Sequence, residues 1–289
     1  MNIINELQNN HDVLLVVIGF FGLIVGSFVN VTIYRLPIML KAVWHKECEM
    51  FLHQEPKVSS ARFNLLYPRS HCPQCKKLVP WWLNIPVVSY LVLRGHCKNC
   101  GAKIPWHYPV VELSSGIGAA VIAAIYGFSL MTLVLCTLTW ALIALIFIDL
   151  EHKLIPDNIT LPLLWLGLLL NAETMFVPPA TAIMGAIVGY LLPWLIARLF
   201  KMVRKVEGMG YGDFKLFAMF GAWFGWQSAI LTLIFSALIG SIIGVTLVLC
   251  KKYRLQQELP FGPYIAIVGW LNIFYGQQLW MWYTNILGW

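Results

Sequence analysis

The sequence predicts an all-α polytopic membrane protein with about eight transmembrane helices and a small cytoplasmic insert between the first two. Composition is the first reason, because 59% of the 289 residues are hydrophobic and only 11% are charged. Ordinary soluble domains carry about 25% charged residues. The mean hydropathy of +0.73 is the second reason. The third is that lysine and arginine gather in a few short stretches between long apolar segments.

Six segments have the roughly 20 apolar residues that cross a bilayer. They are 13–38, 109–128, 130–149, 178–200, 227–250 and 261–284. Two shorter segments, 159–171 and 214–226, need tilt, local thinning of the bilayer or their flanking residues to cross. The opening "MNIINELQNNHD" lacks the basic region of a cleaved signal peptide, so we interpret the first segment as a retained span.

Lys and Arg predict the orientation of these helices, because cytoplasmic loops collect basic residues. With the N-terminus outside and eight crossings, the interior loops are 39–108, 150–158, 201–213 and 251–260. All 20 Lys and Arg residues lie in these loops or at the helix ends that border them. Omitting the two short segments would move basic clusters to the wrong side. Topology therefore explains the net charge of +7 without a nucleic-acid partner.

These features divide the chain into three expected parts. Residues 1–38 form the first transmembrane helix, residues 39–108 the cytoplasmic insert, and residues 109–289 the remaining transmembrane core. The insert holds half of the basic residues and both C-x₂-C pairs.

The insert carries a candidate metal site. Its four cysteines form two C-x₂-C pairs that are 21 residues apart, namely Cys72, Cys75, Cys97 and Cys100. Two tight turns with two thiolates each make a tetrahedral site that suits Zn²⁺, although the gap slightly exceeds the usual spacing. Four cysteines leave no open position, so we expect a structural zinc that staples an insert with little core of its own. Disulfides or free thiols are the alternative, which a cytoplasmic location disfavours.

Acidic residues are scarce in the apolar segments, and two of them are candidates for catalysis. Asp149 ends one segment and Asp213 opens another, so the expected topology places both at the cytoplasmic boundary. Ionisable groups near membrane depth are costly and usually functional. Two adjacent carboxylates share one proton, so one acts as general base on a water while the other polarises a carbonyl. Each could instead be only a helix cap or a boundary residue.

Three glycines precede the second aspartate, in "GMGYGDFKLF". Gly208, Gly210 and Gly212 let the backbone pass close to an extended substrate or a neighbouring helix. The positive end of the following helix favours the ionised form of Asp213.

Five motifs together resemble one known family over nearly the whole chain. They are "GSFVNVTIYRLP" (26–37), the cysteine-bearing segment 72–104, "YPVVELSSG" (108–116), "FIDLEHKLIPDNITLP" (147–162) and "GMGYGDFKLFAMFGAWFGW" (208–226). The sequence is similar to the bacterial prepilin leader peptidase/N-methyltransferases, GxGD-type aspartic proteases of type IV pilus and type II secretion systems. The resemblance implies that Asp149 and Asp213 are the peptidase pair, with Asp157 and Lys215 as motif neighbours.

The resemblance also implies the activity. Members of this family lie in the bacterial inner membrane and cut a basic leader from prepilins and pseudopilins at the cytoplasmic face. They then methylate the new N-terminal residue with S-adenosylmethionine. For this chain, we therefore expect pilin substrates, contact with membrane lipid, and both termini in the periplasm.

The methylation half has less support from the residues, since the chain contains no dinucleotide-type glycine loop. Gly95 lies where the family carries a glycine linked to methylation, but it also fits a turn before a cysteine pair. Asn30 and Arg35 either serve the site or cap a helix and reach the headgroups. Three alternatives stay open: a peptidase without methylation, a scaffold whose insert docks a partner, and a transporter or proton relay. The last is disfavoured because the acids gather at one face.

Overall fold

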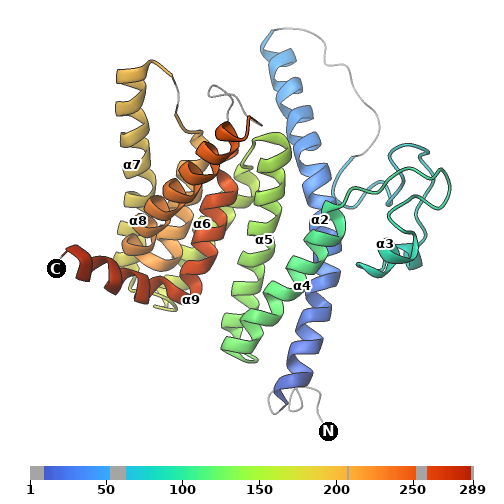
Figure 1. Cartoon of the computed structure of the whole chain (residues 1–289), viewed down its shortest axis with the longest axis horizontal. Helices are drawn as coiled ribbons and strands as arrows, with labels where there is room; N and C mark the ends of the chain where they lie inside the picture. Colours follow the sequence, from blue (N-terminus) through green and yellow to red (C-terminus); the bar gives the residue numbers. More distant parts are fainter. Residues whose placement is uncertain (1–9, 53–62, 207, 252–258, 288–289) are drawn as a thin grey trace. The chain divides into compact units, whose positions relative to one another are not determined.

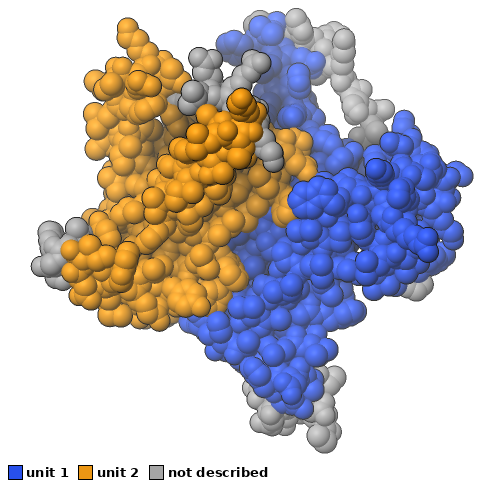
Figure 2. Space-filling model, viewed as in Figure 1, with its two compact units in different colours: residues 1–144 blue, residues 145–289 orange. Residues whose placement is uncertain are grey.

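In a computed structural model the chain forms two compact units, residues 1–144 and 145–289 (Figure 2). The structure describes residues 10–52, 63–206, 208–251 and 259–287, so parts of the expected loops, 53–62 and 252–258, lie outside the described residues. The described chain is helical, with two isolated β-bridges and no strand. Its elements are α2 (His11–Phe51), η1 (Trp81–Asn84), α3 (Val88–Val92), α4 (His107–Tyr126), α5 (Leu130–His152), α6 (Asp157–Ala172), α7 (Pro179–Arg204), α8 (Tyr211–Leu249) and α9 (Gly262–Leu287) (Figure 1).

The predicted fold class is confirmed. Five described helices are long and apolar enough to cross a membrane, namely α2, α4, α5, α7 and α8. All eight expected segments fall on helices, but 214–226 and 227–250 share α8, which is broken at Gly225. The first helix also differs from expectation, since α2 continues past residue 38 to Phe51. Good helix formers such as Met, Leu, Lys, Ala and Glu fill that extension, which explains why the helix outlasts its apolar part.

In the first unit, α2 and α4 pack along a seam of small residues. Added Cβ atoms on Gly22 and Gly26 would lie 2.7 Å from the Ser115 carbonyl oxygen and 2.8 Å from the Glu112 Cα. Small residues let membrane helices approach closely where no hydrophobic force drives them together. The seam therefore fixes the register of α2 against the start of α4.

Arg35 fastens the insert to α2. Its side chain is buried and donates to the backbone carbonyls of Asn64, at 2.9 Å, and Pro68, at 2.6 Å. The guanidinium also lies over the Phe63 ring, 5.8 Å from the centroid. The Arg35 side chain therefore binds backbone carbonyls of the insert and does not extend toward lipid headgroups, which was one of the roles considered from sequence.

In the second unit, α7 and α8 meet along another glycine seam. A Cβ on Gly185 would collide with the backbone of Gly221, and a Cβ on Gly189 would meet the Phe217 carbonyl. Trp223 on α8 is fully buried, and its indole N–H donates to the Leu163 carbonyl of α6 at 2.8 Å. These contacts hold the first half of α8, which carries Asp213, between two neighbouring helices.

The break in α8 is stabilised by one side chain. Gly225 adopts φ 84° and ψ 175°, a conformation that L side chains rarely adopt. Asn171 is fully buried, and its amide donates to the carbonyls of Ala222 and Trp223 at 2.8 and 2.9 Å. The break would otherwise leave these carbonyls without partners in an apolar bundle. The same side chain accepts from Phe176 and Val177, so it ties the α6–α7 loop to the break.

Candidate active site and metal centre

Asp149 and Asp213 come together in the second unit. Asp149 lies in the last turn of α5 and Asp213 in the first turn of α8, and both side chains are buried. Their carboxylates are near enough to interact electrostatically. The structure therefore brings the two residues near each other, although they are far apart in the chain.

Each carboxylate accepts a backbone N–H at the start of a helix. Oδ2 of Asp213 accepts from Gly210 at 3.1 Å, and Oδ2 of Asp149 accepts from Gly262, the first residue of α9, at 2.9 Å. Helix N-termini stabilise negative charge. Among the described residues, the hydrogen bonds to these two carboxylates all go to Oδ2, which leaves Oδ1 of each as an acceptor for other groups. A water and a substrate carbonyl are the groups that such oxygens can bind.

Two glycines bring the three helix ends this close. A Cβ on Gly262 would lie 2.7 Å from Oδ2 of Asp149, and a Cβ on Gly212 would lie 2.8 Å from the Ile155 Cβ. Ile155 is buried and follows the helix that carries Asp149, so its side chain packs against the start of α8. Close helix approach thus accounts for Gly212. For Gly208 the neighbour is the Phe200 ring, at 2.9 Å from an added Cβ.

Asp157 and Lys215 form an ion pair at the edge of the same region. The ammonium of Lys215 lies 2.7 Å from both carboxylate oxygens of Asp157, joining the first turns of α6 and α8. Both side chains are partly exposed, at 28% and 49%. This pair helps to position the start of α8, two residues from Asp213.

The four cysteines of the first unit form one cluster. All four Sγ atoms lie within 4.8 Å of one another, and no described cysteine is disulfide-bonded. Tetrahedral zinc with Zn–S bonds of about 2.3 Å requires S···S separations of about 3.8 Å. The Sγ atoms of Cys72 and Cys100 are 3.8 Å apart. The cluster therefore fits a four-coordinate metal ion.

Two thiols of the cluster, those of Cys97 and Cys100, have pKa values that are shifted in opposite directions. Hydrogen bonds from the backbone N–H groups of Asn99 and Cys100 lower the pKa of Cys97 to about 6, which favours its thiolate. The Ala102 N–H has the same effect on Cys100, but desolvation and the neighbouring thiols outweigh it and raise the pKa of Cys100 to about 11. A bound cation would relieve this crowding of thiolates.

The two cysteine turns have the same construction. In the first, Lys76 donates to the Cys72 carbonyl at 2.9 Å, and in the second Gly101 donates to the Cys97 carbonyl at 2.9 Å. A β-bridge closes each turn, His71 with Leu78 and His96 with Lys103. The insert is thus a short structural repeat, which the sequence analysis did not predict.

Gly95 occupies a turn just before the second cysteine pair. Its φ is +69°, its N–H donates to the Tyr90 carbonyl at 2.9 Å, and a Cβ would lie 3.0 Å from the Tyr90 hydroxyl. These contacts explain why glycine is needed there. A role in binding the methyl donor stays a prediction.

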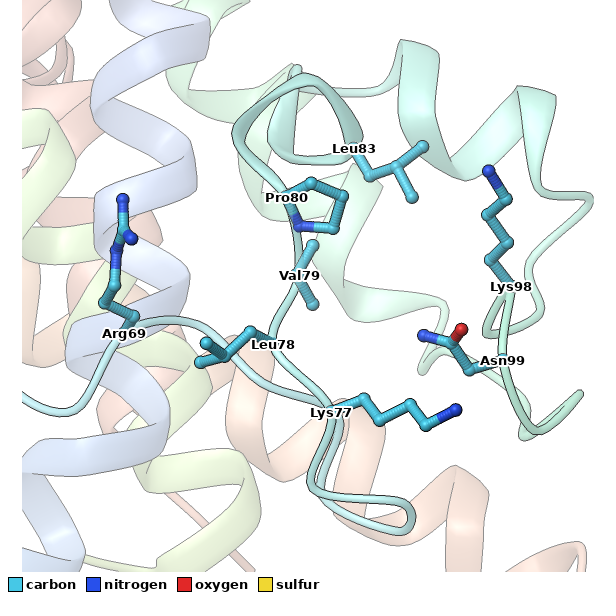
Figure 3. Close-up of a pocket in the computed structure, with 8 residues that line it drawn as sticks. All are labelled: Arg69, Lys77, Leu78, Val79, Pro80, Leu83, Lys98 and Asn99. Carbon is cyan, nitrogen blue, oxygen red and sulfur yellow. The ribbon is translucent and has the colours of Figure 1, made fainter.

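A basic hollow lies beside the cysteine cluster. It has a volume of about 540 Å³, and Figure 3 shows the cationic side chains of Arg69, Lys77 and Lys98 around an apolar wall that includes Pro80 and Leu83. No acidic residue lines it. The hollow therefore favours anionic over cationic groups.

Two protein families match successive parts of the chain. The Bacterial Peptidase A24 N-terminal domain matches residues 20–126, and the Type IV leader peptidase family matches residues 136–245. The second match includes both aspartates and the first includes the four cysteines. A relative named prepilin leader peptidase/N-methyltransferase from Pseudomonas putida is 46% identical over 92% of each chain.

The chain belongs to the type IV leader peptidase family. A relative with the same name from Stutzerimonas stutzeri is 43% identical over 89% of each chain. Another, from Legionella pneumophila, is 40% identical over 98% of this chain and 99% of its own. No solved structure matches the chain.

Sequence reasoning missed two residues that shape this leader peptidase's site. Gly262 is one, and its only signal is a glycine at the start of the last helix, in "LPFGPY". Ile155 is another, because an isoleucine in "KLIPD" carries no sign of its contact with α8. Gly262 could have been found by looking for glycines at helix starts, because a backbone N–H at such a position can bind a buried acid.

Proposed function

We propose that this protein is a bifunctional inner-membrane enzyme. It cleaves the leader from type IV prepilins and pseudopilins with Asp149 and Asp213, and it then N-methylates the new N-terminal residue with S-adenosylmethionine. The observation that carries the proposal is the meeting of two buried aspartates, each held by a glycine N–H at a helix start.

The pair supports hydrolysis without a metal or a covalent intermediate. Two interacting carboxylates cannot both ionise cheaply, so one is ionised and removes a proton from water. The other is protonated and donates a hydrogen bond to the carbonyl of the scissile peptide bond. Burial strengthens both interactions, because low-dielectric surroundings screen charge weakly.

The insert and the topology complete the proposal. Zn²⁺ held by Cys72, Cys75, Cys97 and Cys100 would stabilise the fold of the insert, which has few buried side chains of its own. The distribution of Lys and Arg supports a cytoplasmic insert, periplasmic termini and a catalytic pair at the inner boundary. A prepilin has its leader in the cytoplasm and its helix in the bilayer, so its cleavage site would reach this depth.

Intact mass spectrometry of one prepilin tests both activities. Purified enzyme in liposomes should release the leader, and adding S-adenosylmethionine should add the mass of a single methyl group to the mature chain. Asp213→Asn should reduce cleavage about a thousandfold, since acid–base groups contribute about 10²–10⁴. Full cleavage by this variant would refute the aspartic mechanism, and a mature chain without added mass would refute the methyltransferase.

A further inference from the structure

Glu112 on α4 is a buried carboxylate for which the proposed peptidase has no use. It is 8% exposed, and its Oε2 accepts the N–H of Val87 at 2.7 Å. The side chains of Ser27 and Asn30 lie within reach of the same carboxylate. No described Lys, Arg or His in this unit pairs with it. A buried charge without a counter-ion costs several kcal/mol, so this arrangement suits a cationic ligand.

The backbone beneath the carboxylate is strained. Val87 has φ 61° and ψ −48°, and Val88 donates to the Pro86 carbonyl at 2.6 Å, which makes a tight γ-turn. A β-branched residue at positive φ is unfavourable. The bond from Val87 to Glu112 therefore holds the insert against α4 at this point.

Asn30 offers a second acceptor beside the carboxylate. Its side chain is 4% exposed, and its amide N–H donates to the Tyr108 carbonyl at 3.0 Å. Its Oδ1 is buried with no hydrogen-bond partner. Buried polar atoms are almost always bonded, so this oxygen indicates a missing donor. A carboxylate and a free amide oxygen together match the several N–H donors of an ammonium group.

An apolar groove leads to this polar site. A hollow of about 450 Å³ is bounded on the insert side by residues that include Ser70 and Asn84, and on α2 by Phe20, Ile24, Ser27, Phe28 and Val31. The apolar α2 residues recur at helical spacing along one face, and Phe20 and Ile24 are 60% and 47% exposed. Ser27 joins the two features, because it lines the groove and contacts Glu112.

The hollow beside the cysteines and the α2 groove differ in charge. The hollow beside the cysteines is lined by three cations, whereas the α2 groove has no basic residue in its lining and borders the Glu112 site. Charge complementarity therefore assigns an apolar segment with a cationic head to the α2 groove. The product of leader cleavage has this chemistry, because it is an apolar helix that begins with a free ammonium.

We infer that the α2 groove binds the methyl acceptor, with the apolar N-terminal segment along Phe20, Ile24 and Phe28 and the N-terminal ammonium at Glu112 and Asn30. This inference rests on the proposed methyltransferase function. Glu112 removes one proton from the ammonium, and the freed nitrogen lone pair forms the new N–C bond. The S–C bond of the sulfonium donor breaks and leaves a neutral thioether, while the nitrogen becomes a methylated ammonium.

Methylation of a synthetic mature pilin peptide, supplied without its leader, tests the inference independently of cleavage. Glu112→Gln should lower kcat/KM for the peptide about 100-fold, within the usual contribution of a general base. Glu112→Asp should restore part of it, and KM for S-adenosylmethionine should stay unchanged. Glu47→Gln, on the exposed end of α2, is the matched control and should have no effect. Prepilin cleavage by the Glu112→Gln enzyme should persist and show that it is folded.

A second pair of variants tests the groove. Ile24→Trp should fill it and raise KM for the peptide, whereas Val16→Trp, at an exposed α2 position outside the groove, should not. Wild-type methylation rates in the Glu112→Gln enzyme would overturn the inference. A rise in KM for S-adenosylmethionine alone would also overturn it, by assigning Glu112 to the donor. Wild-type enzyme that fails to methylate the peptide would instead refute the proposed function.

Discussion

The two units hold their buried carboxylates in different ways. In the second unit, Asp149 and Asp213 are a pair, and each is bonded to a glycine N–H at the start of a long helix. In the first unit, Glu112 stands alone and is bonded to the N–H of a strained turn. In both arrangements a backbone N–H donates to the buried carboxylate.

The difference between them indicates different chemistry. A pair of carboxylates keeps one proton and can serve as acid and base at once, which is what peptide hydrolysis requires. A single carboxylate with no cationic partner attracts a cation and accepts its proton. On the proposals above, cleavage takes place in the second unit and methylation in the first.

Asp149→Asn should separate the two activities most strongly. Cleavage of a prepilin should fall about a thousandfold, because the pair loses one of the two carboxylates that act as acid and base. Methylation of a mature peptide should continue at the wild-type rate. Rates of both reactions, measured by mass spectrometry, check this, with the exposed Asp12→Asn as control. Parallel loss of both activities would contradict the division.

Removing the metal should affect the first unit alone. Purified protein should contain about one zinc per chain, and Cys72→Ser combined with Cys75→Ser should abolish it, since two thiolates cannot close a tetrahedral site. Elemental analysis measures the metal, and Cys48→Ser with Cys250→Ser is the matched control. Unchanged zinc content in the first variant would exclude the cluster as the metal site.

The fold class, the cysteine cluster and the approach of the two aspartates could be predicted from sequence, because composition, charge placement and C-x₂-C spacing are local signals. The contacts of Ile155 and Gly262 could not, since nothing near them in the chain indicates which distant helix end they meet. The length of α2 also escaped prediction, because apolar content marks the part of a helix that can span a membrane but not its more polar continuation. The role of Arg35 was similarly hidden, since its partners are backbone carbonyls about 30 residues away.

A methyl group at the start of α9 should disturb the pair moderately. In Gly262→Ala the new Cβ would meet Oδ2 of Asp149 at 2.7 Å, so the carboxylate must move. Small misplacements of catalytic groups cost about 10- to 100-fold, and cleavage should fall by that amount. Gly19→Ala is the control, because its Cβ would make only ordinary contacts. Wild-type cleavage kinetics for Gly262→Ala would show that the bond from Gly262 does not position Asp149.

Lys215→Met should have the smallest effect. The ion pair with Asp157 is partly exposed, so its loss should lower the free energy of unfolding by less than about 1 kcal/mol. The difference should shrink further at high salt, because exposed charges are screened. Thermal unfolding in detergent at two salt concentrations measures it. A large, salt-independent loss would mean that Lys215 acts beyond this pair.

The central claim is that Asp149 and Asp213 act as one unit, and cleavage rates of the Asp149→Asn, Asp213→Asn and doubly substituted enzymes test it most directly. Residues that act together lose their function together, so the double variant should be about as slow as either single variant. A double variant whose rate falls by the product of the two single losses would show two independent contributions, and would contradict a shared-proton pair.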